Sequence, residues 1–140
     1  MENKKFIPNK NGGEITITDQ EGKEILYKGQ YEKATQFWAG NCCVKIQGQW
    51  LVIGEKITRE MDRLPYDDIF DFSNGFAIVK INGSLGRKAK YGYINSNYDE
   101  CVKPIYDEAH NFEGGYGKVK KGGKWGWVDG FGDFYDKLPS

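Results

Sequence analysis

The sequence predicts an all-β fold made of short antiparallel hairpins in a stacked or arc-like sheet arrangement. The prediction rests on a segment that recurs along the chain, on glycine turn signals between β-prone runs, and on the composition. Aromatic residues make up 15% of the 140 residues, while the mean hydropathy is only −0.69. A disordered chain would be poor in aromatic residues. A chain of this length buries about 70% of its unfolded surface and needs no metal or disulfide to be stable.

The recurring segment begins with a tyrosine and ends with Val-Lys. Its three copies align without gaps and occupy residues 31–45, 66–80 and 106–120. Each copy carries a shared phenylalanine followed by a shared glycine; these are Phe37, Phe72 and Phe112, and then Gly40, Gly75 and Gly115. Because glycine adopts positive φ without a steric penalty, the shared glycine predicts a turn or a bulge at that point.

A second half-unit rich in aromatic and β-branched residues follows each copy. These runs occupy residues 48–53, 90–94 and 124–128. Turn signals lie between the halves, at Gln47-Gly48, Asn82-Gly83 and Gly122-Gly123. A glycine turn between two β-prone runs is typical of a hairpin. Each unit is therefore predicted to be a hairpin plus a connection to the next tyrosine.

The N-terminal part fits the same scheme. Residues 14–19 alternate with period two, and residues 24–27 lead into Tyr31, as expected for the second half of a unit. We therefore expect an N-terminal extension followed by one domain, which holds a half unit and three full units. The expected boundaries are 1–12 for the extension, 13–140 for the domain, 13–30 for the half unit, and 31–65, 66–105 and 106–140 for the units.

Motifs in the second and third units resemble those of the bacterial WG-repeat (KWG) family. The sequence KWGWVD at 124–129 and YGYIN at 91–95 are similar to the K-W-G-aromatic-I-D motif, NGFAIVK at 74–80 to the preceding strand, and YDE at 106–108 to the start of a unit. The resemblance covers about residues 13–136. The first unit departs from the motif because Leu51 replaces its glycine.

The resemblance implies a β-rich repeat architecture and a binding role. It implies no catalytic residues, so the chain is not expected to be an enzyme. Some short intracellular proteins of this type serve as immunity partners of secreted toxins, and the resemblance points to that role.

The residues that could carry chemistry have simpler explanations. The cysteines Cys42, Cys43 and Cys101 are odd in number and suggest free thiols in a reducing compartment. Cys42 aligns with alanine and glycine, so its position asks for small volume, whereas Cys43 aligns with isoleucine and lysine and is expected nearer the surface. One histidine, His110, and scattered cysteines do not make a metal site. No catalytic residue, metal ligand or cofactor is therefore predicted.

Paired carboxylates occur at Asp67-Asp68 and again at Asp107-Glu108. Catalytic carboxylates face each other across a cleft, whereas these are sequence neighbours at equivalent positions of two units. Their recurrence indicates a role in the fold.

The charge and hydropathy of the chain limit its partners. The 20 basic and 20 acidic residues cancel, which argues against a dedicated nucleic-acid binder. No apolar run reaches membrane-spanning length, so no membrane partner is expected. The N-terminus lacks the features of a signal peptide, so either the protein stays in the cytoplasm, which is the predicted location, or a leader has been removed.

Positions that differ between the units are not required by the fold and can serve recognition. The second unit has a longer link between its halves than the others, and this insertion gathers Arg87, Lys88 and Lys90. Insertions in repeat proteins often map to the binding face. These three side chains would suit an acidic protein partner, such as a toxin domain.

Two aromatic residues complete the predicted contact surface. Trp38 aligns with Ser73 and Glu113, which suggests a position facing solvent, and an exposed tryptophan is a typical interface anchor. Phe70 is a second candidate because polar residues occupy the same position elsewhere.

The predicted function is a non-enzymatic protein–protein interaction module, with toxin-neutralising immunity as a specific form. The alternative is a carbohydrate or cell-surface binding module that uses exposed aromatic residues. The sequence leaves the oligomeric state open.

Overall fold

The computed structural model describes residues 9–18, 23–38, 40–54, 63–83 and 87–139. These residues form strands joined by turns and irregular connections, without a helix, and are arranged in two compact parts, Met1–Pro65 and Tyr66–Ser140. We call these parts the first and the second unit, and we call the sequence units 31–65, 66–105 and 106–140 the first, second and third repeats. The boundary falls immediately before the tyrosine that opens the second repeat. The prediction that 13–140 is a single domain stays a prediction.

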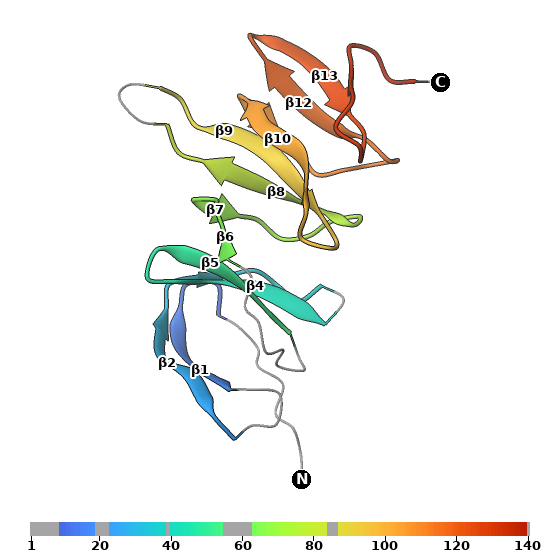
Figure 1. Cartoon of the computed structure of the whole chain (residues 1–140). Helices are drawn as coiled ribbons and strands as arrows, with labels where there is room; N and C mark the ends of the chain where they lie inside the picture. The colour runs from blue at the N-terminus through green and yellow to red at the C-terminus, as the bar shows by residue number, and fades with distance from the viewer. Residues whose placement is uncertain (1–8, 19–22, 39, 55–62, 84–86, 140) are drawn as a thin grey trace. The chain divides into compact units, whose positions relative to one another are not determined.

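The strands follow the repeats predicted from the sequence (Figure 1). The first unit contains β1 (Gly13–Thr18), β2 (Ile25–Tyr31), β3 (Lys33–Ala34), β4 (Asn41–Ile46), β5 (Gln49–Gly54) and β6 (Arg63–Leu64). The second unit contains β7 (Asp68–Ile69), β8 (Phe76–Ile81), β9 (Lys90–Asn95), β10 (Glu100–Tyr106), β11 (Glu108–Ala109), β12 (Gly117–Lys121), β13 (Lys124–Val128) and β14 (Phe134–Tyr135).

Each repeat forms a four-stranded antiparallel sheet with its strands in sequence order. The sheets are β3-β4-β5-β6, β7-β8-β9-β10 and β11-β12-β13-β14, and β1 and β2 form a separate two-stranded hairpin. None of these described sheets closes on itself. The predicted all-β fold of antiparallel hairpin repeats is confirmed.

The shared glycine of each repeat lies in a tight turn. Gly40, Gly75 and Gly115 have φ values of 83°, 87° and 89°. In the second and third repeats the preceding residues, Asn74 and Gly114, also have positive φ, at 54° and 59°. Two consecutive positive φ values are typical of a type I′ turn. The predicted positive φ is therefore confirmed at all three glycines.

The turns between the two halves of a unit follow the prediction in the first and third repeats only. Gln47 and Gly48 have φ values of 51° and 80°, and Gly122 and Gly123 have values of 58° and 82°. The Asn82-Gly83 turn was predicted wrongly, because neither residue has positive φ. The insertion of the second repeat replaces the two-residue turn with a longer loop, which the pairing of Ile81 with Lys90 closes.

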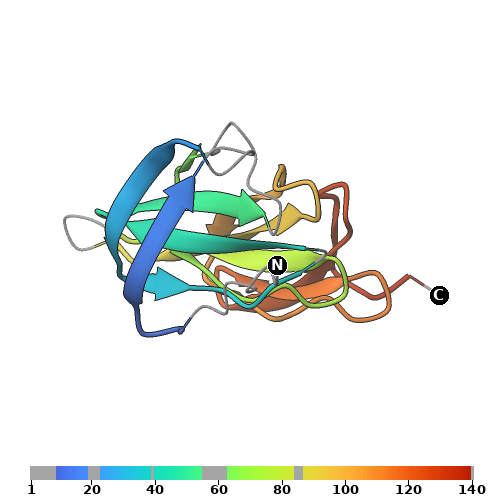
Figure 2. The same cartoon turned by 90° about the horizontal axis from the view of Figure 1, so that it is seen from below.

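The first unit packs the β1–β2 hairpin against sheet β3–β6. Figure 2 shows this hairpin crossing the strands of the sheet. Leu51, which replaces the motif glycine, is 6% exposed and belongs to this core. The buried residues of the core are Ile15, Ile17, Tyr31, Ala34, Cys42, Val44, Ile46 and Leu51.

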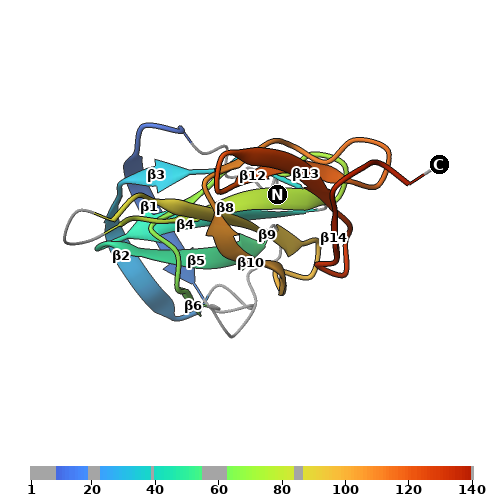
Figure 3. The same cartoon turned by 90° about the horizontal axis from the view of Figure 1, so that it is seen from above.

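The second unit places its two sheets face to face, as Figures 1 and 3 show. Phe112, on the connection between β11 and β12, lies between the sheets. Its ring stacks on Phe76 at 3.9 Å and meets the edge of Tyr93 at 4.8 Å, measured between ring centroids. The Tyr93 hydroxyl donates a hydrogen bond of 2.6 Å to the His110 carbonyl. Gly117 leaves room for the rings of Phe112 and Tyr93, because a Cβ on Gly117 would lie 2.8 Å from an atom of each ring.

The motif glycine of the second repeat, Gly92, allows a close backbone approach. The register of β10 against β9 shifts between Val102 and Tyr106, so β10 bulges at this point. A Cβ on Gly92 would collide with the backbone of Val102, Lys103 and Pro104. The motif glycine is therefore needed for packing, and its φ is not in the left-handed region.

Candidate protein-binding surface

A carboxylate at the start of each repeat braces the tip of the following hairpin. The Glu32 carboxylate accepts a hydrogen bond from the Gly48 amide at 2.8 Å. The Asp67 carboxylate accepts a hydrogen bond from the Asn82 amide at 2.7 Å, and the Asp107 carboxylate accepts one from the Gly122 amide at 3.1 Å. The role in the fold predicted for Asp67 and Asp107 is thereby confirmed.

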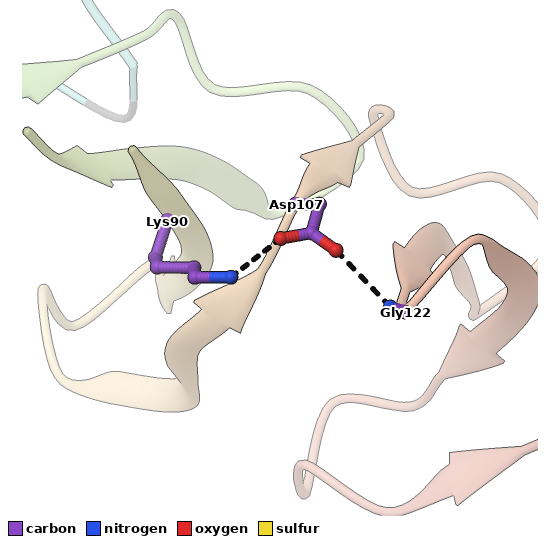
Figure 4. A network of polar contacts seen from close by, with 3 residues as sticks. All are labelled: Lys90, Asp107 and Gly122. Carbon is purple, nitrogen blue, oxygen red and sulfur yellow. Dashed lines mark hydrogen bonds and ion pairs between the residues drawn. The ribbon is translucent and has the colours of Figure 1, made fainter. Parts of the chain in front are cut away.

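Asp107 also joins the two hairpin tips of the second unit. One carboxylate oxygen accepts a hydrogen bond from the Lys90 ammonium at 2.5 Å, and the other accepts one from the Gly122 amide at 3.1 Å (Figure 4). Lys90 begins β9, whereas Gly122 lies in the turn between β12 and β13. The tip of one sheet is therefore held beside the tip of the next.

This contact brings four exposed cations to the same end of the second unit. Arg87 and Lys88 lie in the loop before β9, while Lys121 and Lys124 flank the β12–β13 turn. We call these four residues the basic tip surface. Lys88 is close enough to Asp107 for its charge to lower the pKa of that carboxyl. The predicted loop is thus one half of a larger basic surface.

Lys121 and Lys124 were not part of the predicted contact surface, because their glycine-rich segment was interpreted as a turn alone. The alignment of the repeats could have indicated them. Lys121 and Lys124 flank the hairpin turn of the third repeat, which lies at the same position as the insertion that carries Arg87 and Lys88 in the second repeat. Residues 84–86 of that insertion lie outside the described residues.

The structure brings together only part of the predicted contact set. Lys90 lies beside Arg87 and Lys88, but it is half-buried and paired with Asp107. Phe70 is 44% exposed in the second unit. Trp38 belongs to the first unit and is half-buried, with backbone hydrogen bonds to Asn41. A role in partner binding stays a prediction for each of these residues.

The pairing of Asp107 predicts a dependence of stability on pH. The hydrogen bond from Lys90 lowers the pKa of the Asp107 carboxyl below its usual value, and the Gly122 amide adds to this. A carboxyl whose pKa is lower in the folded state stabilises the fold above its unfolded pKa of about 4, and this contribution is lost as the pH falls through the folded pKa.

The variant Asp107→Asn is therefore expected to be less stable than the wild type at about pH 6, and the difference should be smaller at about pH 2. Urea denaturation of both proteins at the two pH values measures the difference. An equal difference at both pH values would show that Asp107 acts through its shape and not its charge.

The cysteines are poorly placed for nucleophilic chemistry. Burial raises the pKa of both Cys42 and Cys43 to about 12, and that of Cys101 to about 11. Cys43 was expected nearer the surface, but its exposed fraction is 0%. Sheet β3–β6 is buried on both faces at this point, because the neighbouring residues Cys42 and Val44 are buried as well. Within the described part of the chain, no group of His, Cys, Asp or Glu side chains could hold a metal ion.

The sheet β11–β14 carries a second concentration of cations and aromatic rings. Trp125 is 37% exposed. The ammonium groups of Lys118 and Lys120 lie 5.0 and 5.5 Å from the centroid of its ring, and the His110 ring lies 5.3 Å away. Cations at these distances are attracted to the face of an indole ring. Lys120 also pairs with Glu108 at 3.4 Å.

Open sheets of repeated antiparallel hairpins define an all-β repeat protein. Residues 66–84 and 91–125 match the family model described as WG containing repeat. These residues, which cover most of the second unit, are similar to the WG-repeat family. No curated protein and no solved structure matches the chain significantly.

In the described ranges no helix has the length and apolar character needed to cross a membrane.

Proposed function

We propose that the chain is a non-enzymatic protein-binding module whose basic tip surface contacts an acidic partner protein. The observation that carries this proposal is the gathering of Arg87, Lys88, Lys121 and Lys124 at one end of the second unit. The four side chains are exposed, whereas Lys90 is committed to Asp107. A cluster of one charge sign speeds the encounter with an oppositely charged protein.

The structure of the tips also suits a preformed contact surface. The carboxylate of Asp107 fixes the tip of β12–β13 relative to the start of β9 through two hydrogen bonds. Fewer groups must then be ordered when a partner binds, which lowers the entropic cost of association.

Neutralising the basic tip surface is expected to slow association with the partner. Three immobilised proteins are compared for the proteins they retain at low salt. They are the wild-type full chain, the tip variant Arg87→Gln/Lys88→Gln/Lys121→Gln/Lys124→Gln, and the control Lys103→Gln/Lys137→Gln. Lys103 and Lys137 are exposed residues of the same unit outside the surface. A partner kept by the wild type and the control should associate about tenfold more slowly with the variant, with a weaker salt dependence.

A partner that associates equally fast with the wild type and the tip variant would overturn the assignment of this surface. The control, which removes two positive charges elsewhere in the same unit, shows whether losing positive charge outside the surface also slows association.

We further propose that the partner is a toxin domain and that the chain acts in the cytoplasm as its immunity protein. The partner would be masked by contact and not modified, in keeping with the burial of Cys42 and Cys43. The test is co-expression with a toxin domain encoded beside this chain. Growth should be restored by the wild type and by the control, but not by the tip variant. Toxicity that persists with the wild type would contradict this form of the function.

A carbohydrate or cell-surface ligand is the alternative, favoured by the exposure of aromatic side chains. Phe131 is 90% exposed and Trp125 is 37% exposed, and sugars stack on such rings. Binding of the full chain to a glycan array that survives the four tip substitutions would favour this alternative over the proposed one.

A further inference from the structure

Sheet β11–β14 of the second unit has one face that other described elements of the unit do not cover. Its inner face packs on the preceding sheet through Val119 and Val128. Strand alternation directs the neighbouring side chains to the opposite face, where Lys118 pairs with Trp127 and Lys120 with Trp125 across the two strands. We call this the outer face.

The preceding sheet, β7–β10, shows what packs on the face that corresponds to the outer face. In sheet β7–β10 the positions of Lys118 and Trp127 are occupied by Ile78 and Tyr93, which are paired across β8 and β9 in the same register. That face is covered by the segment 106–116, which inserts Phe112 between Phe76 and Tyr93.

The outer face repeats the aromatic part of this binding site. Tyr116 takes the place of Phe76, and Trp127 takes the place of Tyr93. Both rings are half-buried, and Tyr116 is supported by edge contact with Tyr135 at 5.9 Å. The indole N–H of Trp127 can donate a hydrogen bond to a carbonyl, as the Tyr93 hydroxyl does to His110.

The outer face differs from the covered one in charge. Lys118 replaces Ile78; its side chain is exposed, and its ammonium lies 5.0 Å from the centroid of the Trp125 ring. Lys120 adds a second ammonium, which Glu108 partly offsets. An occupant of this face would therefore need carboxylates as well as an aromatic ring.

We propose that the outer face of sheet β11–β14 is a docking site for an acidic segment of a partner protein, which places one aromatic side chain between Tyr116 and Trp127 and a carboxylate against Lys118. The segment would lie on this sheet as residues 106–116 lie on the preceding one. This contact is separate from the basic tip surface, which consists of hairpin ends and not of a sheet face.

The chain itself supplies a probe with the required chemistry. A synthetic peptide of residues 106–116, YDEAHNFEGGY, carries one phenylalanine together with Asp107, Glu108 and Glu113. Binding of this peptide to the full chain is followed by the NMR signal of the Trp127 indole N–H, assigned with the variant Trp127→Phe. A saturable shift is expected, and it should be absent for a peptide with alanine in place of Phe112.

Protein variants test the role of charge. Lys118→Glu should weaken peptide binding by at least about tenfold, because a like charge then faces the carboxylates. Lys118→Ile copies the preceding repeat, so it should fold normally, keep the ring contact and lose the salt dependence. Lys103→Glu is the control for net charge, and Arg87→Gln/Lys88→Gln should bind the peptide as the wild type does.

The proposal is overturned if the peptide causes no saturable shift, if the alanine peptide binds equally well, or if Lys118→Glu leaves the affinity unchanged. Loss of binding in Arg87→Gln/Lys88→Gln would assign the peptide to the basic tip surface and would also overturn it. Because the peptide assay does not involve the natural partner, its result is independent of the function proposed above.

Discussion

Replacing Phe112 with alanine is expected to destabilise the second unit by about 3–5 kcal/mol, the usual cost of removing a large buried aromatic side chain. Phe112 is 1% exposed and contacts Phe76 and Tyr93 from the facing sheet. Its loss would leave a cavity between the two sheets, and both rings would lose their packing partner. Chemical denaturation followed by circular dichroism measures the change in the free energy of unfolding.

Phe131→Ala is the matched control, because Phe131 has the same side chain but is 90% exposed. A surface substitution of this kind is expected to change the stability by no more than about 0.5 kcal/mol. A cost below about 1 kcal/mol for Phe112→Ala would mean that the two sheets are not held together by this ring.

Gly92→Ala is expected to destabilise the protein by about 1–3 kcal/mol, in the range found for overpacked interiors. In an ordinary strand the same change would be favourable by about 0.5–1 kcal/mol, because glycine loses more backbone entropy on folding. The sign is reversed here because the new Cβ would collide with the backbone of β10 at Val102 and Pro104. A backbone segment cannot move aside as a flexible side chain can.

The control for this substitution is Gly123→Asn. Gly123 has a φ of 82° and open space around its Cβ position, and asparagine tolerates positive φ in turns. The stability of this variant should therefore stay close to that of the wild type in thermal denaturation. If Gly92→Ala were equally harmless, the close approach of β10 would not be what requires the motif glycine.

The hairpin repeats could be predicted from the sequence because their signals are local. A turn with positive φ at Gly75 or Gly115 depends on a few neighbouring residues, and three copies in one chain separate the shared residues from the variable ones. The same comparison placed the recurring carboxylates Asp67 and Asp107 in the fold, although it did not show that they brace hairpin tips.

By itself, the sequence determined the fold class, the repeat positions, two of the three central turns and the basic loop at Arg87 and Lys88. Only the tertiary structure decided that Cys43 is buried, that Lys90 is paired with Asp107, and that Lys121 and Lys124 extend the basic surface. The physical reason is that turns and strand alternation are set by neighbours along the chain. Burial and ion pairing depend instead on which segments meet in space, and equivalent positions of a repeat meet different neighbours.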